Sequence, residues 1–426
     1  MGKNMLQKKE LETEQLRKLK ILLNYAGIHV PYYRQKFREL RIGLDDINSF
    51  YDFQRVPFLV RKTIQKQWHD FLSDEYQEKN LIFRFTSGTT GEPLKCAMTH
   101  QERIIAGRHL FRARTRWELD FPARCALLGG ATHFAIGDPN SYRDKFSLSK
   151  NVLLLLPVLD LSASSLDKYL QELLSFQPNW IYGLPSGVAQ IAAHASKNNQ
   201  RLELPGLKLI ELAGEFLTHE HRQVISDVFQ ISPANQYACS ELWGIAFECS
   251  LGGMHLLTEH VYVEIIGTKG EDLPLGEIGE VVITGLNNRS QPFIRYKTGD
   301  LAKLCNVPCP CGDSHPTIEL VDGRVTQRIV GAEEKIGTLI FDAIVKGLFT
   351  RGLGGIAQYC VIQRSTILFQ VCIVKDYTWT QECQFFFEEQ AKKMLGSHIK
   401  LQFTFVDKIT EQISGKRFSF IVDIKS

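Results

Sequence analysis

Helix-like and strand-like segments alternate through the middle of the chain. Residues 166–176 have apolar side chains at helical spacing, and the short run at 179–183 reads as a following strand. Residues 187–196 again have helical spacing, and 207–214 read as a strand that ends in a small-residue turn. This alternation is typical of α/β proteins, in which helices cover the faces of a sheet. We therefore expect layered α/β sheets in a chain whose 426 residues leave room for two or three domains.

The pattern changes toward the C-terminus. Residues 277–286 read as a strand of an antiparallel or barrel-like β segment. The C-terminal part has helix and strand patterns of its own, at 341–349, 366–374, 384–395 and 401–407. We therefore expect a large N-terminal domain over residues 1–322 and a small α+β domain over residues 323–426.

Charge and composition exclude several classes of protein. The 50 basic and 47 acidic residues give a formal charge of only +3, so we expect no nucleic acid as a partner. The first 27 residues place leucines at helical spacing among charges, which predicts an amphipathic helix packed on the protein rather than on a membrane. The longest apolar run, at 152–159, is too short to span a bilayer. Ten cysteines without an export signal predict reduced thiols in a cytoplasmic protein.

A loop rich in glycine and hydroxyl groups directly follows a predicted strand at 81–85. Its sequence, residues 86–93, is "TSGTTGEP". Backbone N–H groups of such a turn can surround a phosphate, because glycine permits the close approach and the unusual dihedral angles. The loop lacks the GxxxxGK[ST] pattern of a P-loop and the GxGxxG pattern of a dinucleotide-binding turn. A phosphate-binding loop of another kind is therefore predicted, with a flexible surface loop as the alternative.

This loop resembles the phosphate loop of the adenylate-forming (AMP-binding) superfamily, which includes acyl-CoA synthetases, peptide-synthetase adenylation domains and luciferases. In many members a lysine directly follows the proline, whereas here Leu94 separates Pro93 from Lys95. The resemblance implies that ATP phosphates contact Thr86, Ser87, Gly88, Thr89, Thr90 and Gly91.

Further motifs of the superfamily follow in the expected order. "YACSELWG" resembles the aromatic-x-x-[Ser/Thr]-Glu segment, which implies that Tyr237 stacks on adenine, Ser240 reaches phosphate and Glu241 holds Mg²⁺. "LAGEF" resembles the segment that borders the adenine, at Gly214 and Glu215.

The ribose and the catalytic lysine are assigned by three motifs nearer the C-terminus. "YKTGDL" resembles the segment whose aspartate, here Asp300, accepts hydrogen bonds from both ribose hydroxyls. "DGR" resembles the hinge segment whose arginine, Arg324, also reaches the ribose, although Thr326 and Gln327 replace the acidic pair that usually follows. "ISGKRFSFI" resembles the segment that supplies the catalytic lysine, here Lys416.

Two other segments narrow the resemblance to one branch. "AGIHVPYYRQKF" and "CPCGDSHP" resemble the phenylacetate–CoA ligase-like branch. The resemblance implies ATP-dependent activation of a carboxylic acid as acyl-AMP, followed by transfer to a thiol, most often coenzyme A. It also implies that the small C-terminal domain is mobile and rotates between the two steps.

Several questions stay open at this level. The acceptor could instead be an amine or a carrier-protein thiol, and a nucleotide-binding protein that has lost catalysis is a further alternative. The sequence identifies neither the carboxylic acid nor the oligomeric state. A homodimer is one alternative for the oligomeric state. By analogy with relatives, "GGATHFAIG" and "YGLPSG" are expected to line the acid pocket, with His133, Phe134, Gly183 and Pro185.

Cysteine and histidine gather in two short segments. "ECSLGGMHLLTEH" and "CNVPCPCGDSH" each carry thiols and an imidazole beside Gly and Pro. Zinc in structural sites prefers four nitrogen or sulfur ligands in a tetrahedron. We therefore expect a structural zinc site, with Cys305 and His315 as reserve ligands and ordinary reduced thiols as the alternative. The preferred ligands are Cys249, His255, Cys309 and Cys311.

Overall fold

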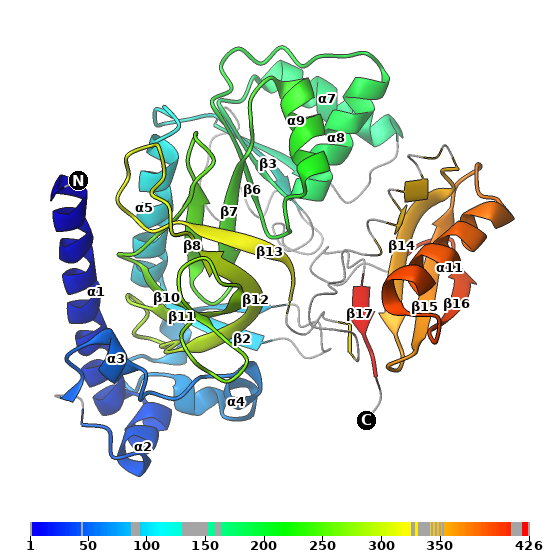
Figure 1. Ribbon diagram of the computed structural model, residues 1–426. Helices are drawn as coiled ribbons and strands as arrows, with labels where there is room; N and C mark the ends of the chain where they lie inside the picture. Colours follow the sequence, from blue (N-terminus) through cyan, green and yellow to red (C-terminus); the bar gives the residue numbers. More distant parts are fainter. Residues whose placement is uncertain are drawn as a thin grey trace. The chain divides into compact units, whose positions relative to one another are not determined.

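The structure is a computed structural model of the chain (Figure 1). It describes residues 2–43, 46–86, 94–129, 152–157, 163–324, 329–330, 341, 344–345, 347–348, 351, 353–409 and 420–424. The chain divides into two compact units. The first comprises residues 1–298 and 302–319, and the second comprises residues 299–301 and 320–426.

A seven-stranded sheet forms the centre of the first unit, with strand order β4-β3-β5-β6-β7-β8-β9. The first five strands in this order are parallel, and the last two are antiparallel. Their bounds are β3 Cys125–Gly129, β4 Leu153–Pro157, β5 Trp180–Gly183, β6 Leu209–Ala213, β7 Ala234–Cys239, β8 Trp243–Glu248 and β9 Met254–Leu256.

Helices cover both faces of this sheet. Three of them, α7 (Ala163–Phe176), α8 (Pro185–Lys197) and α9 (His219–Phe229), lie together on one face (Figure 1). Their apolar side chains form a buried cluster with alternate residues of the strands, such as Ile210 and Leu212. Because side chains alternate along a strand, every second one points to the same face of the sheet. These side chains pack with the apolar side chains of the helices in a single core.

The opposite face is covered by α5 (His100–Thr115). This helix begins at a capping box, in which the Thr99 hydroxyl accepts from the Glu102 N–H and the Glu102 carboxylate accepts from the Thr99 N–H. Near its other end, Arg114 donates to both carboxylate oxygens of Glu211, at 2.7 and 2.9 Å. Glu211 is fully buried in β6, so this ion pair ties α5 to the middle of the sheet.

The remaining elements of the N-terminal part surround this core. α1 packs its later leucines, among them Leu19 and Leu22, into the interior. These elements are α1 Gly2–His29, α2 Pro31–Glu39, α3 Phe50–Phe53, α4 Arg61–Lys66, the 3-10 helices Trp68–Phe71 and Glu78–Asn80, and the antiparallel pair β1 Leu81–Thr86 and β2 Leu94–Thr99. A second sheet has the order β10-β11-β12-β13, with bounds Val261–Ile266, Gly279–Gly285, Tyr296–Leu304 and Ile318–Arg324.

The second unit has its own sheet, of order β16-β15-β14-β17. The helix α11 (Gln381–Leu395) packs on it through Phe387 and Ala391, which share a buried cluster with Val361 and Val371. The strands are β14 Ile356–Gln363, β15 Leu368–Lys375, β16 Lys400–Phe405 and β17 Phe420–Val422.

The predicted fold class, a large layered α/β domain followed by a small α+β domain, is confirmed. The helix expected at 341–349 lies partly outside the described residues. No helix in the described part of the chain is long and apolar enough to cross a membrane. The mobility expected of the small domain stays a prediction.

Candidate active site and metal cluster

Several predicted site residues follow the carboxyl ends of the parallel strands. Gly183 ends β5, Gly214 follows β6, and Ser240 follows β7. The register pairs Gly183 with Leu212 and Ala213 with Gln236, so these strand ends share one edge of the sheet. The direction of strand order reverses at β3, which lies between β4 and β5. Ligands of open α/β sheets bind at such an edge, near the strand where the order reverses.

Two loops at this edge, which follow β5 and β6, are held close together. A Cβ atom on Gly183 would lie 2.9 Å from the carbonyl oxygen of Leu128, so a glycine is required there. Pro185 starts α8, and the Ser186 N–H donates to the Glu215 carboxylate at 3.0 Å. Gly214 has a φ of +90°, which a side chain would strain. The proposed acid and adenine segments therefore contact each other through Glu215 and the start of α8.

The end of β7 and the turn that follows it carry the proposed adenine and metal residues. Tyr237 and Glu241 are buried, and Ser240 is half-buried. Trp243, two residues beyond Glu241, has a φ of +71°, an uncommon and strained value for a large residue. The guanidinium of Arg84 lies over its ring, 4.4 Å from the centroid. Strain of this kind is typical of functional turns.

Glu241 has a partner that no local sequence pattern indicates. The hydroxyl of Tyr296 donates to Oε1 of Glu241 at 3.0 Å. Burial, together with the nearby Glu241 carboxylate, raises the pKa of Tyr296 well above its ordinary value. Tyr296 is the first residue of the quoted "YKTGDL" motif, but an aromatic residue in a strand ordinarily indicates only core packing.

Asp300 lies four residues further along β12 and is half-buried, next to Gly299 with a φ of +77°. Thr86 ends β1 and Arg324 ends β13, but their side chains are not described. Other predicted site residues lie outside the described residues altogether. They are Ser87, Gly88, Thr89, Thr90, Gly91, His133, Phe134 and Lys416.

Lys95, which follows the glycine loop, contacts aromatic rings. Its ammonium group lies 3.8 Å from the ring centroid of Trp68 and 4.1 Å from that of Phe83. It also lies 3.9 Å from the Glu78 carboxylate. These contacts give the lysine a packing role on the β1–β2 pair.

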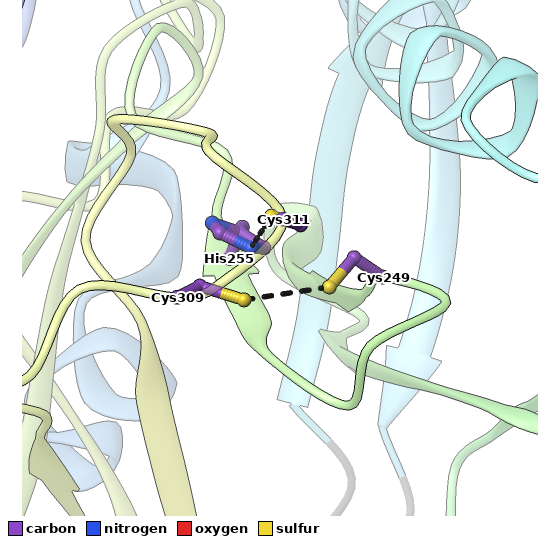
Figure 2. A group of neighbouring side chains, drawn as sticks. All are labelled: Cys249, His255, Cys309 and Cys311. Atoms are coloured by element: carbon purple, nitrogen blue, oxygen red, sulfur yellow. Dashed lines mark hydrogen bonds between the residues drawn. The ribbon is translucent and has the colours of Figure 1, made fainter.

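The structure brings four Cys and His side chains together beside β9. Figure 2 shows Cys249, His255, Cys309 and Cys311 pointing toward one another. All four ligand atoms lie within 4.8 Å of one another. The Cys249 and Cys309 sulfurs are 3.7 Å apart, and the Cys311 sulfur is 3.2 Å from His255 Nε2. Tetrahedral zinc with Zn–S bonds of about 2.3 Å needs sulfurs about 3.8 Å apart, so the donor set and spacing fit zinc.

Glycines and backbone hydrogen bonds shape the two loops that meet here. A Cβ atom on Gly253 would lie 2.5 Å from the Cys309 sulfur, so only glycine lets the loops approach this closely. The Gly252 N–H donates to the Cys249 carbonyl at 2.9 Å, and the Gly312 N–H donates to the Cys309 carbonyl at 3.2 Å. Each cysteine thus sits in a tight turn that directs its sulfur to the centre of the cluster.

The ring of His255 is oriented for metal binding through Nε2. Its Nδ1 is 3.1 Å from the carbonyl oxygen of His315 and donates to it in the tautomer that leaves Nε2 as a lone-pair donor. Burial lowers the pKa of His255, which keeps the ring neutral. Of the two reserve ligands, His315 pairs with Asp313, and Cys305 lies outside the group of four ligand atoms.

The thiols of the second loop differ in acidity. Burial raises the pKa of Cys311 to about 11. At Cys309 burial acts in the same direction, but hydrogen bonds from the Cys311 N–H and from the neighbouring thiols outweigh it and lower the pKa. A sulfur held close to other donors in this way suits a cluster of thiolate ligands.

Comparisons with known proteins agree with this architecture. No family model matches the chain. A phenylacetate-coenzyme A ligase from Thermus thermophilus is 26% identical over 340 residues, covering 76% of this chain and 75% of the relative. One from Pseudomonas putida is 28% identical over 299 residues, covering 69% and 66% of the two chains. These relatives confirm the resemblance to the phenylacetate–CoA ligase-like branch of the adenylate-forming superfamily.

Solved structures show the same fold. A 2-hydroxyisobutyryl-CoA ligase in complex with 2-HIB-AMP has a TM-score of 0.72 at 19% identity, covering 97% of this chain and 89% of that one. The same enzyme in complex with 2-HIB-AMP and CoA has a TM-score of 0.64 at 20% identity. At these identities the likeness establishes the fold alone.

Proposed function

We propose that the protein is an acid–thiol ligase that activates a carboxylic acid with ATP as acyl-AMP and then transfers the acyl group to coenzyme A. The observation that carries this function is the similarity to phenylacetate-coenzyme A ligases over 76% of the chain. The site is consistent with it, because the proposed acid and nucleotide segments meet at one edge of the parallel sheet.

The first half-reaction brings two anions together, the carboxylate of the acid and the phosphates of ATP. Tyr237 would stack on the adenine beside Gly214 and Glu215, and Asp300 with Arg324 would hold the ribose. The residues of the glycine loop, with Ser240, would surround the phosphates through N–H and hydroxyl donors. Holding both reactants in line lowers the barrier, because it removes the entropy cost of bringing them together.

Glu241 is the proposed ligand for Mg²⁺. Its carboxylate is buried, and one oxygen is fixed by Tyr296 at 3.0 Å. Mg²⁺ is commonly bound by one or two carboxylates together with substrate phosphates and water, so this donor set fits the ion. When bound, the ion supplies charge neutralisation to the phosphates. Lys416, on the small domain, would add a positive charge between the carboxylate and the α-phosphate.

In the second half-reaction, the sulfur of coenzyme A attacks the acyl carbon and AMP leaves. The thiol loses its proton to solvent, the C–S bond forms as the bond between the acyl carbon and the phosphate oxygen breaks, and AMP departs with that oxygen. Rotation of the small domain between the steps would remove Lys416 and admit the thiol.

The four-ligand cluster is proposed as a structural zinc site. Four protein ligands leave no open coordination position, so zinc there would not activate water. Its effect would be to hold the loop after β8 against the loop that follows β12, the strand that carries Asp300.

An ATP–pyrophosphate exchange screen over a panel of carboxylic acids tests the proposal. The panel should begin with phenylacetate and extend to other aryl acids and to short 2-hydroxy acids. We expect pyrophosphate exchange with at least one acid. We also expect coenzyme A to accelerate the release of AMP from the acyl-AMP of that acid. Exchange without any effect of coenzyme A would point to an amine or carrier-protein acceptor, and no exchange with any acid would contradict the proposed activity.

A further inference from the structure

The hydroxyl of Tyr296 contacts the carboxylate on which the proposed chemistry depends. The side chain is 3% exposed, and its hydroxyl lies 3.0 Å from Oε1 of Glu241. The two residues are 55 positions apart in the sequence: Glu241 lies in the turn between β7 and β8, and Tyr296 starts β12 of the second sheet. Tyr296 therefore joins the turn after β7 to the start of β12.

The backbone around Tyr296 is fixed on both sides. The Leu59 N–H donates to the carbonyl of Arg295, and the Lys297 N–H donates to the carbonyl of Leu59, each at 2.9 Å. The ring packs edge-on against Phe293, with centroids 5.3 Å apart. A side chain held by its backbone and by its ring has few alternative rotamers, so its hydroxyl stays in one place.

A tyrosine hydroxyl is protonated at neutral pH, and here it is the donor because a carboxylate can only accept. A hydrogen bond to one oxygen fixes the rotation of a carboxylate and so the direction of the other oxygen. Partners of this kind orient metal ligands, and their loss typically weakens metal binding or activity by roughly 10- to 100-fold.

We propose that Tyr296 is a positioning residue that fixes the Glu241 carboxylate for a divalent cation bound with ATP. The inference rests on the proposed function, in which Glu241 is the ligand for Mg²⁺. It adds a residue of β12 to that site, four positions before the proposed ribose ligand Asp300.

Tyr296→Phe tests this inference, because it removes the hydroxyl and keeps the ring against Phe293. The matched control is Tyr33→Phe. Tyr33 is also 3% exposed, and its hydroxyl bonds the backbone of the same segment, donating to the Pro292 carbonyl at 3.0 Å and accepting from the Ile294 N–H at 3.2 Å. Both variants lose a buried hydroxyl near Phe293, but only one of these hydroxyls contacts Glu241.

Binding of Mn²⁺ in the presence of ATP, followed by the electron paramagnetic resonance signal of free Mn²⁺, reports on the metal without requiring turnover. We expect Tyr296→Phe to weaken Mn²⁺ binding by about 10-fold or more, and Tyr33→Phe to bind as the wild type does. The Mg²⁺ concentration for half-maximal pyrophosphate exchange should rise by a similar factor. Equal Mn²⁺ binding by the two variants would overturn the inference.

A second comparison does not depend on the stability of either tyrosine variant alone. In a Glu241→Gln background, removal of the Tyr296 hydroxyl should have no further effect on Mn²⁺ binding, because the carboxylate that it orients is gone. Additive losses would show that Tyr296 acts elsewhere. A wild type that exchanges pyrophosphate with an acid but shows no tyrosine effect contradicts the inference alone, whereas a wild type without exchange or ATP-dependent Mn²⁺ binding contradicts the proposed function as well.

Discussion

Replacing Cys309 by serine removes one sulfur from the cluster at β9 and should release the zinc proposed there. The two loops would then keep hydrogen bonds such as those from the Leu256 N–H to the Pro316 carbonyl at 2.8 Å and from His255 Nδ1 to the His315 carbonyl at 3.1 Å. We expect the variant to contain less than stoichiometric zinc and to unfold at lower urea concentration than the wild type.

The size of the effect follows from the chain length between the ligands. Cys249 and Cys309 are 60 positions apart. A cross-link that closes a loop of this length lowers the conformational entropy of the unfolded chain by an amount worth about 4 kcal/mol at 25 °C. Zinc closes this loop in the unfolded chain only while its ligands stay bound, so the measured loss should not exceed this value and should be about 2 to 4 kcal/mol.

Cys305→Ser is the matched control, since Cys305 lies in the same loop but outside the four-ligand cluster. Zinc content is measured by elemental analysis, and unfolding by tryptophan fluorescence. Trp117 contributes a local signal, because its indole N–H donates to the carbonyl of Glu248, next to Cys249. Equal zinc content and equal urea midpoints for Cys309→Ser and Cys305→Ser would refute the reasoning.

Three further predictions concern catalysis, the core and pH. Glu241→Gln and Lys416→Ala should each lower the rate of acid-dependent pyrophosphate exchange by roughly 10²-fold or more in folded protein; exchange at the wild-type rate in Lys416→Ala would point instead to Lys408 or Lys425. Arg114→Leu should lower the free energy of unfolding by about 3 to 5 kcal/mol, because it leaves Glu211 buried without its partner; a urea titration of Arg114→Leu with Glu211→Leu should recover most of that loss. Burial, and then the neighbouring His260, lower the pKa of His109 to about 4. The folded protein therefore binds fewer protons than the unfolded chain, and its stability should decline as pH falls from about 6.5 toward 4, by about 2 kcal/mol for this partly solvated ring. Unfolding at a series of pH values should show a smaller decline in His109→Gln.

Local patterns were sufficient to predict two strands of the central sheet, β5 and β6, and two of the helices that cover it, α7 and α8. The apolar residues of segments 166–176 and 207–214 recur at the spacing expected of one buried face of a helix or a strand. The structure has α7 and β6 in these segments. Contacts between distant residues left no such pattern. Arg114 and Glu211 are 97 positions apart, and neither has a local neighbour that would indicate a buried pair.

The candidate site shows the same division between local and distant information. Glu241 and Asp300 could be proposed from the sequence because each lies in a contiguous motif that resembles a known one. Tyr296 was not found, because its role depends on a hydrogen bond across 55 positions. The preference for Cys309 over Cys305 as a ligand agrees with the group of four that the structure brings together, where the turn at Gly312 and the close approach at Gly253 position the Cys309 sulfur.

The division of the chain into units has a consequence for the order in which the protein folds during synthesis. The large unit is not complete at residue 298, because residues 302–319 belong to it. Those residues include Cys309 and Cys311, which face Cys249 and His255. A nascent chain that has emerged only to residue 298 would therefore expose two thiol-cluster side chains without their counterparts. We expect the ribosome-bound large unit to become protease-resistant only after residue 319 has left the exit tunnel, and a fragment cut at 298 to remain open where one cut at 319 closes.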